Sequence, residues 1–567
     1  MPHSPHVFRA HVADLDARCF RPAELTIAAG RIEKLTLLPA SALPPAAPYL
    51  IPGFVDAHVH VESSLLTPAE FARLAVAHGT VGTVSDPHEI ANVLGVKGVD
   101  FMLADAARVP DFAFAFGAPS CVPATVFETA GATVSVADIE TLFQDPRIGY
   151  LAEMMNWPGV LFGDAEVHAK IALAQRYGRP VDGHAPGLRG EQARQYAAAG
   201  MSTDHECFTA AEALDKLEAG MHILIREGSA ARNFDALVDL LADPRWADYL
   251  MFCSDDKHPD TLAVNHIDEL VRRALARGLD PWTVLRVACL NPVRHYRLPV
   301  GLLREGDRAD FLVIDGPPSP TMRVQQTWLN GKLVAENGVS RLRPAPSDLA
   351  APNFFVAEPR VPADFRLVAA GPVATARVIV AEDGQLVTGE ARVAMPVVNG
   401  TIDADPAQDV LKIAVVNRYA PHAPVAVALV RGVGFRRGAV ASSVAHDSHN
   451  IVAVGCSDDA ICRAVNLVIG AGGGLAATDA APTPTDHVLP LPVAGLMSAA
   501  DGYEVAAAYT RLDQFSKHVL GSALGAPFMT VSFLALLVIP ALKLSDKGLF
   551  DGARFVFVEA VTDQIPE

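Results

Sequence analysis

Cysteine is scarce in this chain, and the few cysteines present are not arranged for cross-linking. Only seven occur among 567 residues, and no two of them form a C-x-x-C pair. A disulfide-dense secreted scaffold is therefore excluded. We expect reduced thiols and a cytoplasmic protein.

Long hydrophobic runs and an excess of positive charge are also missing. The most apolar stretch, FMTVSFLALLVIPALKL, is interrupted by Pro540 and Lys543 and is short for a membrane span, so it predicts a core strand or helix. The stretch MPHSPHVFRAHVADLD lacks the apolar run of a signal peptide. A formal charge of -18 argues against nucleic acid or an anionic membrane as a partner. A small neutral ligand remains compatible with this composition.

A repeated pattern of short apolar runs and helical stretches occupies the chain from about residue 51 to residue 298. Such strand-then-helix units favour a parallel sheet, and eight of them predict a closed (β/α)₈ barrel. The eight runs are YLIPGFVDAHV, TVGTVSDPH, FAFAFGAPS, IGYLAEMMN, RPVDGHAP, MSTDHE, HILIREGS and YLMFCSDD. Most of them end in polar residues, which we expect to converge at the barrel mouth that the carboxyl ends of the strands form.

The regions on either side of the barrel predict further units. Alternating segments before and after it, the later one with an Asn330-Gly331 hairpin turn, predict one small β-sandwich built from both. After a Pro/Ala-rich linker, the remaining residues predict a separate α/β domain. The predicted boundaries are 1–50 and 299–341 for the sandwich, 51–298 for the barrel, 342–353 for the linker and 354–567 for the C-terminal domain.

The stretch PGFVDAHVHVESS ends the first run and places His58 and His60 two residues apart. In a strand, residues two apart point to the same face, so both imidazoles project side by side with Asp56 and Glu62. Alone, such a pair is more often a polar strand face than a metal site. Other imidazoles and carboxylates at the ends of later runs make the metal interpretation the stronger one.

Four histidines and two carboxylates at these strand ends can hold two divalent ions. In the predicted set, His58, His60 and Asp255 bind one ion, His184 and His205 bind the other, and Glu153 bridges both. A water between two such ions loses its proton near neutral pH. Asp255 can take that proton and later deliver it to the leaving group.

Strand parity separates Asp255 from its neighbour Asp256. Adjacent strand residues point to opposite faces, and the small Cys253 suits the barrel interior while the bulky Phe252 suits the outer helices. We therefore expect Asp255 to face the metals and Asp256 to point away.

The order of these ligands resembles that of the amidohydrolase superfamily. Within it, the chain resembles the bacterial adenine deaminases from the first barrel strand nearly to its C-terminus. The stretches that carry the resemblance are PGFVDAHVHVESS, SDPHEIANVLG, CVPAT, LAEMMNWPGV, DGHAPGL, IREGSAARN, HDSHNIVAVG, LPLPVAGLMS and ALKLSDKGLFDG.

The resemblance implies hydrolysis of adenine to hypoxanthine and ammonia in purine salvage, with manganese in the metal pair and iron, then zinc, as alternatives. Glu153 stands where hydantoinases carry a carbamate-modified lysine, which disfavours cyclic-amide hydrolysis. A homodimer is also expected. The rival interpretations are a deaminase or hydrolase of another small heterocycle and a non-catalytic scaffold of this fold.

Two further motifs leave alternatives open. In SDPHEIANV, the acids either cap the following helix or recognise the purine, with Glu89 as a buried protonated acid at N1 and Asp86 positioning it. Glu62 is a second candidate for that acid. In AHDSHN, the residues His446, Asp447 and His449 predict a hydrogen-bonded turn near the barrel mouth rather than a further metal site.

Overall fold

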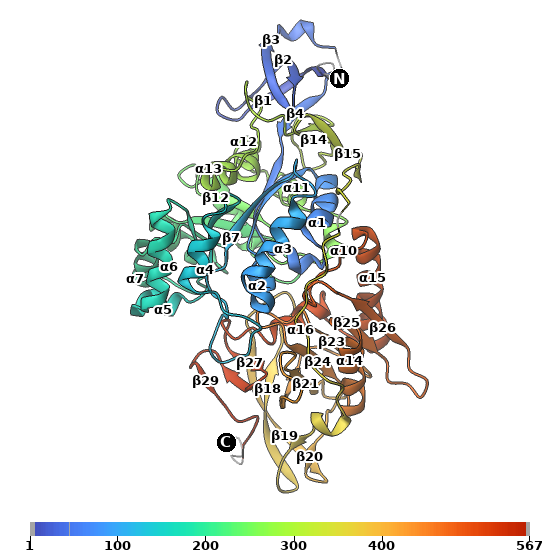
Figure 1. Cartoon of the computed structure of the whole chain (residues 1–567). Helices are drawn as coiled ribbons and strands as arrows, with labels where there is room; N and C mark the ends of the chain where they lie inside the picture. Colours follow the sequence, from blue (N-terminus) through green and yellow to red (C-terminus); the bar gives the residue numbers. More distant parts are fainter. Residues whose placement is uncertain (1–5, 45, 347, 563–567) are drawn as a thin grey trace.

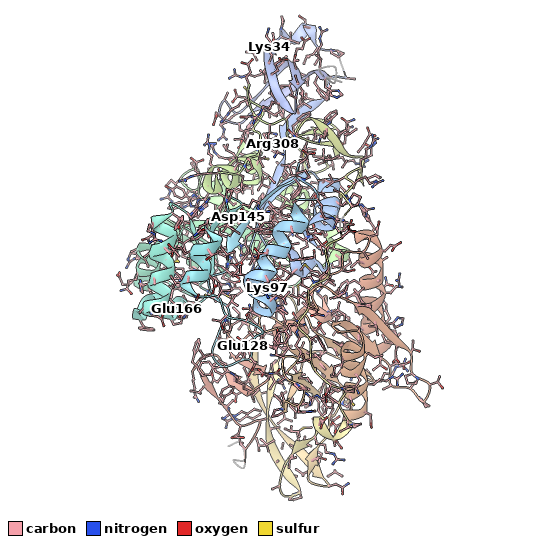
Figure 2. The ribbon with its side chains drawn as sticks, in the orientation of Figure 1. Lys34, Lys97, Glu128, Asp145, Glu166 and Arg308 are labelled. Atoms are coloured by element: carbon pink, nitrogen blue, oxygen red, sulfur yellow. The ribbon has the colours of Figure 1, made fainter. Side chains whose placement is uncertain are left out.

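The structure, a computed structural model, describes residues 6–44, 46–346 and 348–562 and has three parts stacked along one axis (Figure 1). A sheet that contains the first described strands lies at one end, a barrel lies in the middle, and a C-terminal part lies at the other end. Figure 2 shows Lys34 on the first part, Lys97 on the barrel and Glu128 where the barrel meets the third.

Eight parallel strands form the barrel, as predicted. Five of these strands pair side by side in the order β5 to β9, and the other three pair in the order β10 to β12. The Ser202 N–H joins the two groups by donating to the Val181 carbonyl. The barrel closes where the Asp255 N–H donates to the His58 carbonyl and the His60 N–H donates to the Asp255 carbonyl. The strands are β5 (Phe54–Val59), β6 (Thr80–Ser85), β7 (Ala113–Ala118), β8 (Ile148–Met154), β9 (Val181–Gly183), β10 (Thr203–Asp204), β11 (His222–Arg226) and β12 (Leu250–Cys253).

The barrel helices bury one apolar stripe each. In α11 (Ile267–Ala276), buried residues recur at the three- and four-residue spacing of an amphipathic helix. Local caps fix several helix starts, as where the Asp164 carboxylate accepts the backbone N–H groups of Glu166 and Val167. The other helices are α1 (Pro68–Ala75), α2 (His88–Leu94), α3 (Val96–Ala106), α4 (Val136–Leu142), α5 (Trp157–Phe162), α6 (Ala165–Arg176), α7 (Gly190–Ala198), α8 (Ala210–Glu218), α9 (Phe234–Leu237), α10 (Pro259–Leu262), α12 (Pro281–Leu285) and α13 (Asn291–Tyr296).

The segments before and after the barrel join in one sheet of eight strands. The predicted Asn330-Gly331 turn is confirmed, because both residues have positive φ, 49° and 71°, as a two-residue hairpin requires. The Phe8 ring lies 5.2 Å from that of Trp328 although two strands separate them, so the sheet curls around its own core. In sheet order the strands are β16 (Val339–Ser340), β15 (Lys332–Glu336), β14 (Val324–Leu329), β13 (Phe311–Ile314), β4 (Tyr49–Pro52), β1 (His6–Asp14), β2 (Cys19–Ala28) and β3 (Arg31–Leu37).

The C-terminal part is built on a large, mostly antiparallel sheet. Its strands in order are β17 (Leu367–Val368), β20 (Thr401–Ile402), β19 (Gly389–Val398), β18 (Val373–Val380), β22 (Val425–Arg431), β21 (Leu411–Val416), β24 (Ile451–Gly455), β23 (Ala439–Ser442), β25 (Gly474–Thr478) and β26 (Asp486–Pro490), with β30 (Val561–Thr562) beside β18. A small sheet adds β27 (Leu542–Ser545), β28 (Gly548–Asp551) and β29 (Val556–Phe557). The helices are α14 (Asp458–Gly470), α15 (Gly502–Phe515) and α16 (Pro527–Phe533).

The apolar stretch singled out in the sequence forms α16 and β27. Phe528, Met529 and Val531 are buried there, which confirms the predicted core position. No helix among the described residues is both long and apolar enough to span a membrane.

The C-terminal part packs against the barrel mouth. The Ser498 N–H donates to the Leu65 carbonyl and the Ser498 carbonyl accepts the Thr67 N–H, just after β5. Asn450 donates to the Thr129 carbonyl, in a barrel loop. Residues far apart in the sequence therefore meet where the barrel strands end.

Candidate metal centre

Glu153, near the end of β8, lies among four imidazoles from other barrel strands. Its Oε2 lies 2.9 Å from His184 Nδ1 and 3.0 Å from His205 Nε2. Its Oε1 lies 3.6 Å from His60 Nε2, and His58 Nε2 is 4.0 Å from Oε2. All five side chains are buried. Oε1 thus faces His60 while Oε2 faces His58, His184 and His205, so the two oxygens have different imidazole partners, as a bridging ligand needs.

His58, His60 and Asp255 form the second half of the cluster. The two Nε2 atoms are 3.3 Å apart, and Asp255 Oδ1 lies 3.5 Å from His58 Nε2 and 3.3 Å from His60 Nε2. Burial favours the neutral form of Asp255, but the Arg226 guanidinium and both histidines hold its pKa well below the usual range. The aspartate is therefore a carboxylate.

The donor set fits divalent metal ions. Imidazole nitrogens and carboxylate oxygens suit first-row divalent ions. The Nε2 atoms of His58 and His60 are 3.3 Å apart, and the cluster-facing nitrogens of His184 and His205 lie 2.9 and 3.0 Å from the same Glu153 oxygen. Nitrogen lone pairs that converge this closely repel one another unless a proton or a cation lies between them. Two of the possible metal-holding groups are His58 with Glu153 and His205, and His58 with His60 and Asp255.

Arg226 at the end of β11 connects this cluster to a residue that the sequence did not single out. Its guanidinium donates to Asp255 Oδ2 at 2.7 Å and to Glu206 Oε2 at 3.0 Å. Glu206 Oε1 in turn lies 3.5 Å from His205 Nε2. Arg226 therefore forms ion pairs with two residues outside its own IREGSAARN stretch. The position of Glu206 directly after His205 could have indicated it.

Glu89, in the first turn of α2, is held by two histidines of the C-terminal part. His446 Nδ1 lies 2.5 Å from Glu89 Oε1, and His449 Nε2 contacts Oε2. Burial favours the neutral acid, but His446, His449 and His88 together lower the pKa of Glu89 well below the usual range. The expectation that burial keeps Glu89 protonated is therefore wrong, because neighbouring imidazoles outweigh burial.

The other two acids of this region serve the backbone. Asp86 Oδ1 accepts the His88 N–H at 3.0 Å, as a helix cap does, and its Oδ2 accepts the Glu153 N–H at 3.2 Å. Glu62 Oε1 accepts the Ile90 N–H at 3.2 Å, and burial raises the pKa of Glu62 to about 7. Neither acid is among the residues that line the cavity at the cluster.

Asp255 and Asp256 both line that cavity, so the expected opposite orientation of Asp256 is wrong. Asp255 has a φ of 55°, in the left-handed region, and this interrupts the strand alternation on which the expectation depended. Asp256 Oδ1 accepts a hydrogen bond from Ser63.

The barrel and the C-terminal part enclose the cavity together. It holds about 20 Å³, roughly the space of a single water molecule, so a larger ligand enters only when lining side chains move. Its lining residues are His60, His88, Glu89, Glu153, Met155, His184, His205, Glu206, Asp255 and Asp256 from the barrel, and Leu386, His446, Asp447, Phe533 and Leu536 from the C-terminal part.

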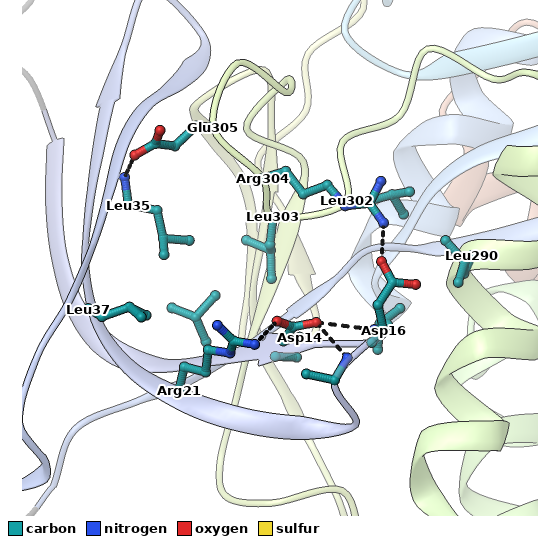
Figure 3. A pocket seen from close by; sticks show the side chains of 14 residues that line it. Asp14, Asp16, Arg21, Leu35, Leu37, Leu290, Leu302, Leu303, Arg304 and Glu305 are labelled. Carbon is teal, nitrogen blue, oxygen red and sulfur yellow. Dashed lines mark hydrogen bonds and ion pairs between the residues drawn. The ribbon is translucent and has the colours of Figure 1, made fainter.

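A larger cavity of about 540 Å³ lies between the N-terminal sheet and the barrel (Figure 3). Its charged groups are paired internally: Arg21 with Asp14 at 2.8 Å and Arg304 with Asp16 at 2.7 Å. It contains none of the clustered histidines, and the chemistry therefore belongs to the small cavity.

Comparison with known proteins agrees with this geometry. Residues 49–334 match the model of the amidohydrolase family, and residues 385–556 match that of the adenine deaminase C-terminal domain. The chain is 57% identical to an adenine deaminase of Salinibacter ruber, over 97% of this chain and 98% of that protein. It is 50% identical to one of Sulfurovum sp., over 97% and 99%. It is also 48% identical to an adenine deaminase of Methanosarcina barkeri, over 90% of this chain and 92% of that protein.

Proposed function

Because this chain belongs to the adenine deaminase family of the amidohydrolases, we propose that its buried cluster of histidines and carboxylates hydrolyses adenine to hypoxanthine and ammonia. The observation that carries the proposal is the position of Glu153, with His58, His60, His184 and His205 all within 4.0 Å of its oxygens.

The cluster would hold two divalent ions. His58, His60 and Asp255 would bind one, His184 and His205 the other, and Glu153 both. Such ions, when bound, lower the pKa of a water to near neutrality and so supply a nucleophile. We propose manganese in both positions, with iron and zinc as alternatives.

Asp255 is the proposed proton carrier. Arg226 fixes its Oδ2, so Oδ1, on the side of the histidines, is the oxygen that takes the proton of the attacking water. Asp255 then passes this proton to the 6-amino group, and the bond from C6 to that nitrogen breaks to release ammonia.

Glu89 is the proposed partner of the purine N1. Attack at C6 places negative charge on N1, which then needs a proton. Glu89 is a carboxylate, but it shares a proton with His446. Burial lowers the pKa of His446, the Glu89 charge raises it, and the result is a pKa of about 9. In this proposal the proton passes from His446 through Glu89 to N1. The C6 hydroxyl loses its proton as the carbonyl forms, and this proton returns through solvent to His446. Asp86 is the proposed positioning residue for Glu89. Glu62, whose pKa is raised to about 7, is the alternative source of the proton.

Ammonia release from adenine by manganese-loaded protein tests this function. Metal-free protein is the control, and adenosine, guanine and cytosine form the panel that tests the substrate. Turnover of another heterocycle in place of adenine would overturn the substrate assignment. Absence of any turnover by fully metal-loaded protein would favour the non-catalytic scaffold.

Cellular location and assembly complete the proposal. All seven cysteines are free thiols, which supports a reducing compartment such as the cytoplasm. The homodimer stays a prediction, which light scattering of the purified protein would test.

A further inference from the structure

Two buried polar atoms of the C-terminal part lack a hydrogen-bond partner and belong to residues that line the small cavity. They are Nε2 of His446 and Oδ2 of Asp447, on residues that are 2% and 4% exposed. Both residues line the cavity. Since buried polar atoms are almost always paired, these two are candidates for contact with a bound molecule.

The orientation of His446 is fixed on its other side. Its Nδ1 donates to Glu89 at 2.5 Å, and its ring stacks on Phe533 with centroids 4.7 Å apart. His449 completes the arrangement, because its Nδ1 accepts the Ala445 N–H and its hydrogen must therefore be on Nε2, which contacts Glu89. Glu89 Oε1 thus accepts the His446 N–H, and His449 Nε2 forms an ion-pair contact with Oε2. The group is a hydrogen-bonded support, and His446 Nε2 is left for the cavity.

We propose that His446 and Asp447 bind the N3 and N9–H edge of the free adenine base. The proposal rests on the proposed function, which places C6 at the histidine cluster and N1 at Glu89. N3 follows N1 along the same edge of the ring, and His446 lies next to Glu89. His446 offers an N–H donor and Asp447 a carboxylate oxygen. These match the acceptor N3 and the donor N9–H, which are both bonded to C4 of the purine.

This arrangement gives the C-terminal part a direct role in specificity. A nucleoside has no hydrogen on N9 and carries its sugar at that atom, so it leaves Asp447 Oδ2 without a hydrogen-bond partner and crowds the side chain. A site that is built to bond an N–H group discriminates strongly against a ligand that lacks it, because the unpaired carboxylate is costly. The C-terminal part therefore selects the free base over the nucleoside.

Two substitutions of His446 separate its contacts. The amide nitrogen of Asn occupies the place of the imidazole Nδ1, so His446→Asn keeps the bond to Glu89 and loses N3. The amide of Gln reaches the place of Nε2, so His446→Gln keeps the N3 contact. Affinity is measured by equilibrium dialysis in an Asp255→Asn background, in which adenine is not turned over, with adenine and with 3-deazaadenine, which lacks the N3 acceptor. The exposed His518→Asn is the matched control.

The expected result is that His446→Asn weakens adenine binding by roughly 10- to 100-fold, as for a lost hydrogen bond to a charged group. Its binding of 3-deazaadenine should stay at the wild-type level, and His446→Gln should recover part of the adenine affinity. Equal losses for both bases, or no loss in a folded His446→Asn variant, would overturn the N3 contact.

Asp447→Asn tests the other half of the edge. The comparison base is 9-deazaadenine, which keeps the shape of adenine but has no N9–H donor, and the exposed Asp459→Asn is the control. Adenine should bind about 10-fold or more weakly to the variant, with little change for 9-deazaadenine. Unchanged discrimination between the two bases would refute the contact. Binding is measured apart from turnover, so failure of wild-type protein to deaminate adenine would count against the proposed function and not against this edge.

Discussion

Asp255 is the residue on which the proposed chemistry depends most, because one of its oxygens faces the metal-binding histidines and Arg226 fixes the other. Asp255→Asn removes the proton acceptor, so kcat should fall by about 10²–10⁴-fold or more. Asp256→Asn should have a smaller effect, because Asp256 bonds Ser63 at the edge of the cavity. Deamination rates and metal content of both variants check this. The reverse order of the two effects would contradict the assignment of Asp255.

Glu89→Gln tests the proton supply to N1. The amide keeps the size of the side chain but carries no charge to pair with His446 and His449, and it cannot relay a proton. We expect a loss of about 10²–10⁴-fold in kcat with the metal content retained. If the variant deaminates adenine at nearly the wild-type rate, Glu89 has only a structural role and Glu62 becomes the candidate for the proton donor.

At the scale of elements, the ends of β10, β11 and β12 are held together by one cation. Arg226 is fully buried between Glu206 and Asp255, and its charge is matched only within this group. Arg226→Met takes the guanidinium from two buried carboxylates and leaves them with their histidine contacts alone. Breaking a buried ion pair typically costs about 3–5 kcal/mol. Chemical denaturation should show a loss of this order. The matched control is Arg245→Met, which breaks an exposed pair with Asp243 and should leave the free energy of unfolding nearly unchanged. Equal effects of the two substitutions would contradict this role of Arg226.

The convergence of strand ends explains why much of the barrel and its candidate site was predictable. His58, His184 and His205 stand far apart in the sequence, but each ends an apolar run, and parallel barrel strands bring such ends to one mouth. Backbone detail was not predictable in the same way. The left-handed φ of Asp255 breaks the two-residue period from which the orientation of Asp256 was inferred.

At the scale of the whole molecule, contacts between the barrel and the C-terminal part lie beyond what local patterns encode. Glu89 and His446 are 357 positions apart, and no periodicity connects them. The AHDSHN stretch therefore predicted a turn near the barrel mouth. It did not predict the contacts of this turn with Glu89 or the effect of those contacts on the Glu89 pKa. Long-range pairs of this kind depend on how complete folded units dock.

Glu128 lies at this junction (Figure 2) and gives the molecule a predictable pH dependence. Burial, with Asp447 and Asp546 nearby, raises its pKa to about 8 from an ordinary value of 4.5. Between these pH values the folded state binds more protons than the unfolded state, so stability falls as pH rises through that window. Glu128→Gln stays neutral and escapes this loss, so its stability relative to wild type should rise by up to about 1.4 kcal/mol per pH unit.

Denaturation at pH 5 and pH 8 measures this effect. The exposed Glu218→Gln is the control and should show no such trend. A relative stability of Glu128→Gln that does not change between the two pH values would show that Glu128 ionises as freely in the folded protein as in the unfolded chain.

Removal of metal should separate the chemistry from the fold. The barrel core consists of buried apolar side chains, none of which is a cluster histidine, so chelated protein should keep its secondary structure. The clustered imidazoles and carboxylates should then lose the ions that hold them together. This loss lowers stability, because a ligand present at 100 times its Kd stabilises a protein by about 2.7 kcal/mol. We therefore expect a lower Tm, an unchanged circular dichroism spectrum at 25 °C and loss of ammonia release from adenine. Added manganese should restore both Tm and turnover, whereas full activity in rigorously metal-free protein would refute the binuclear site.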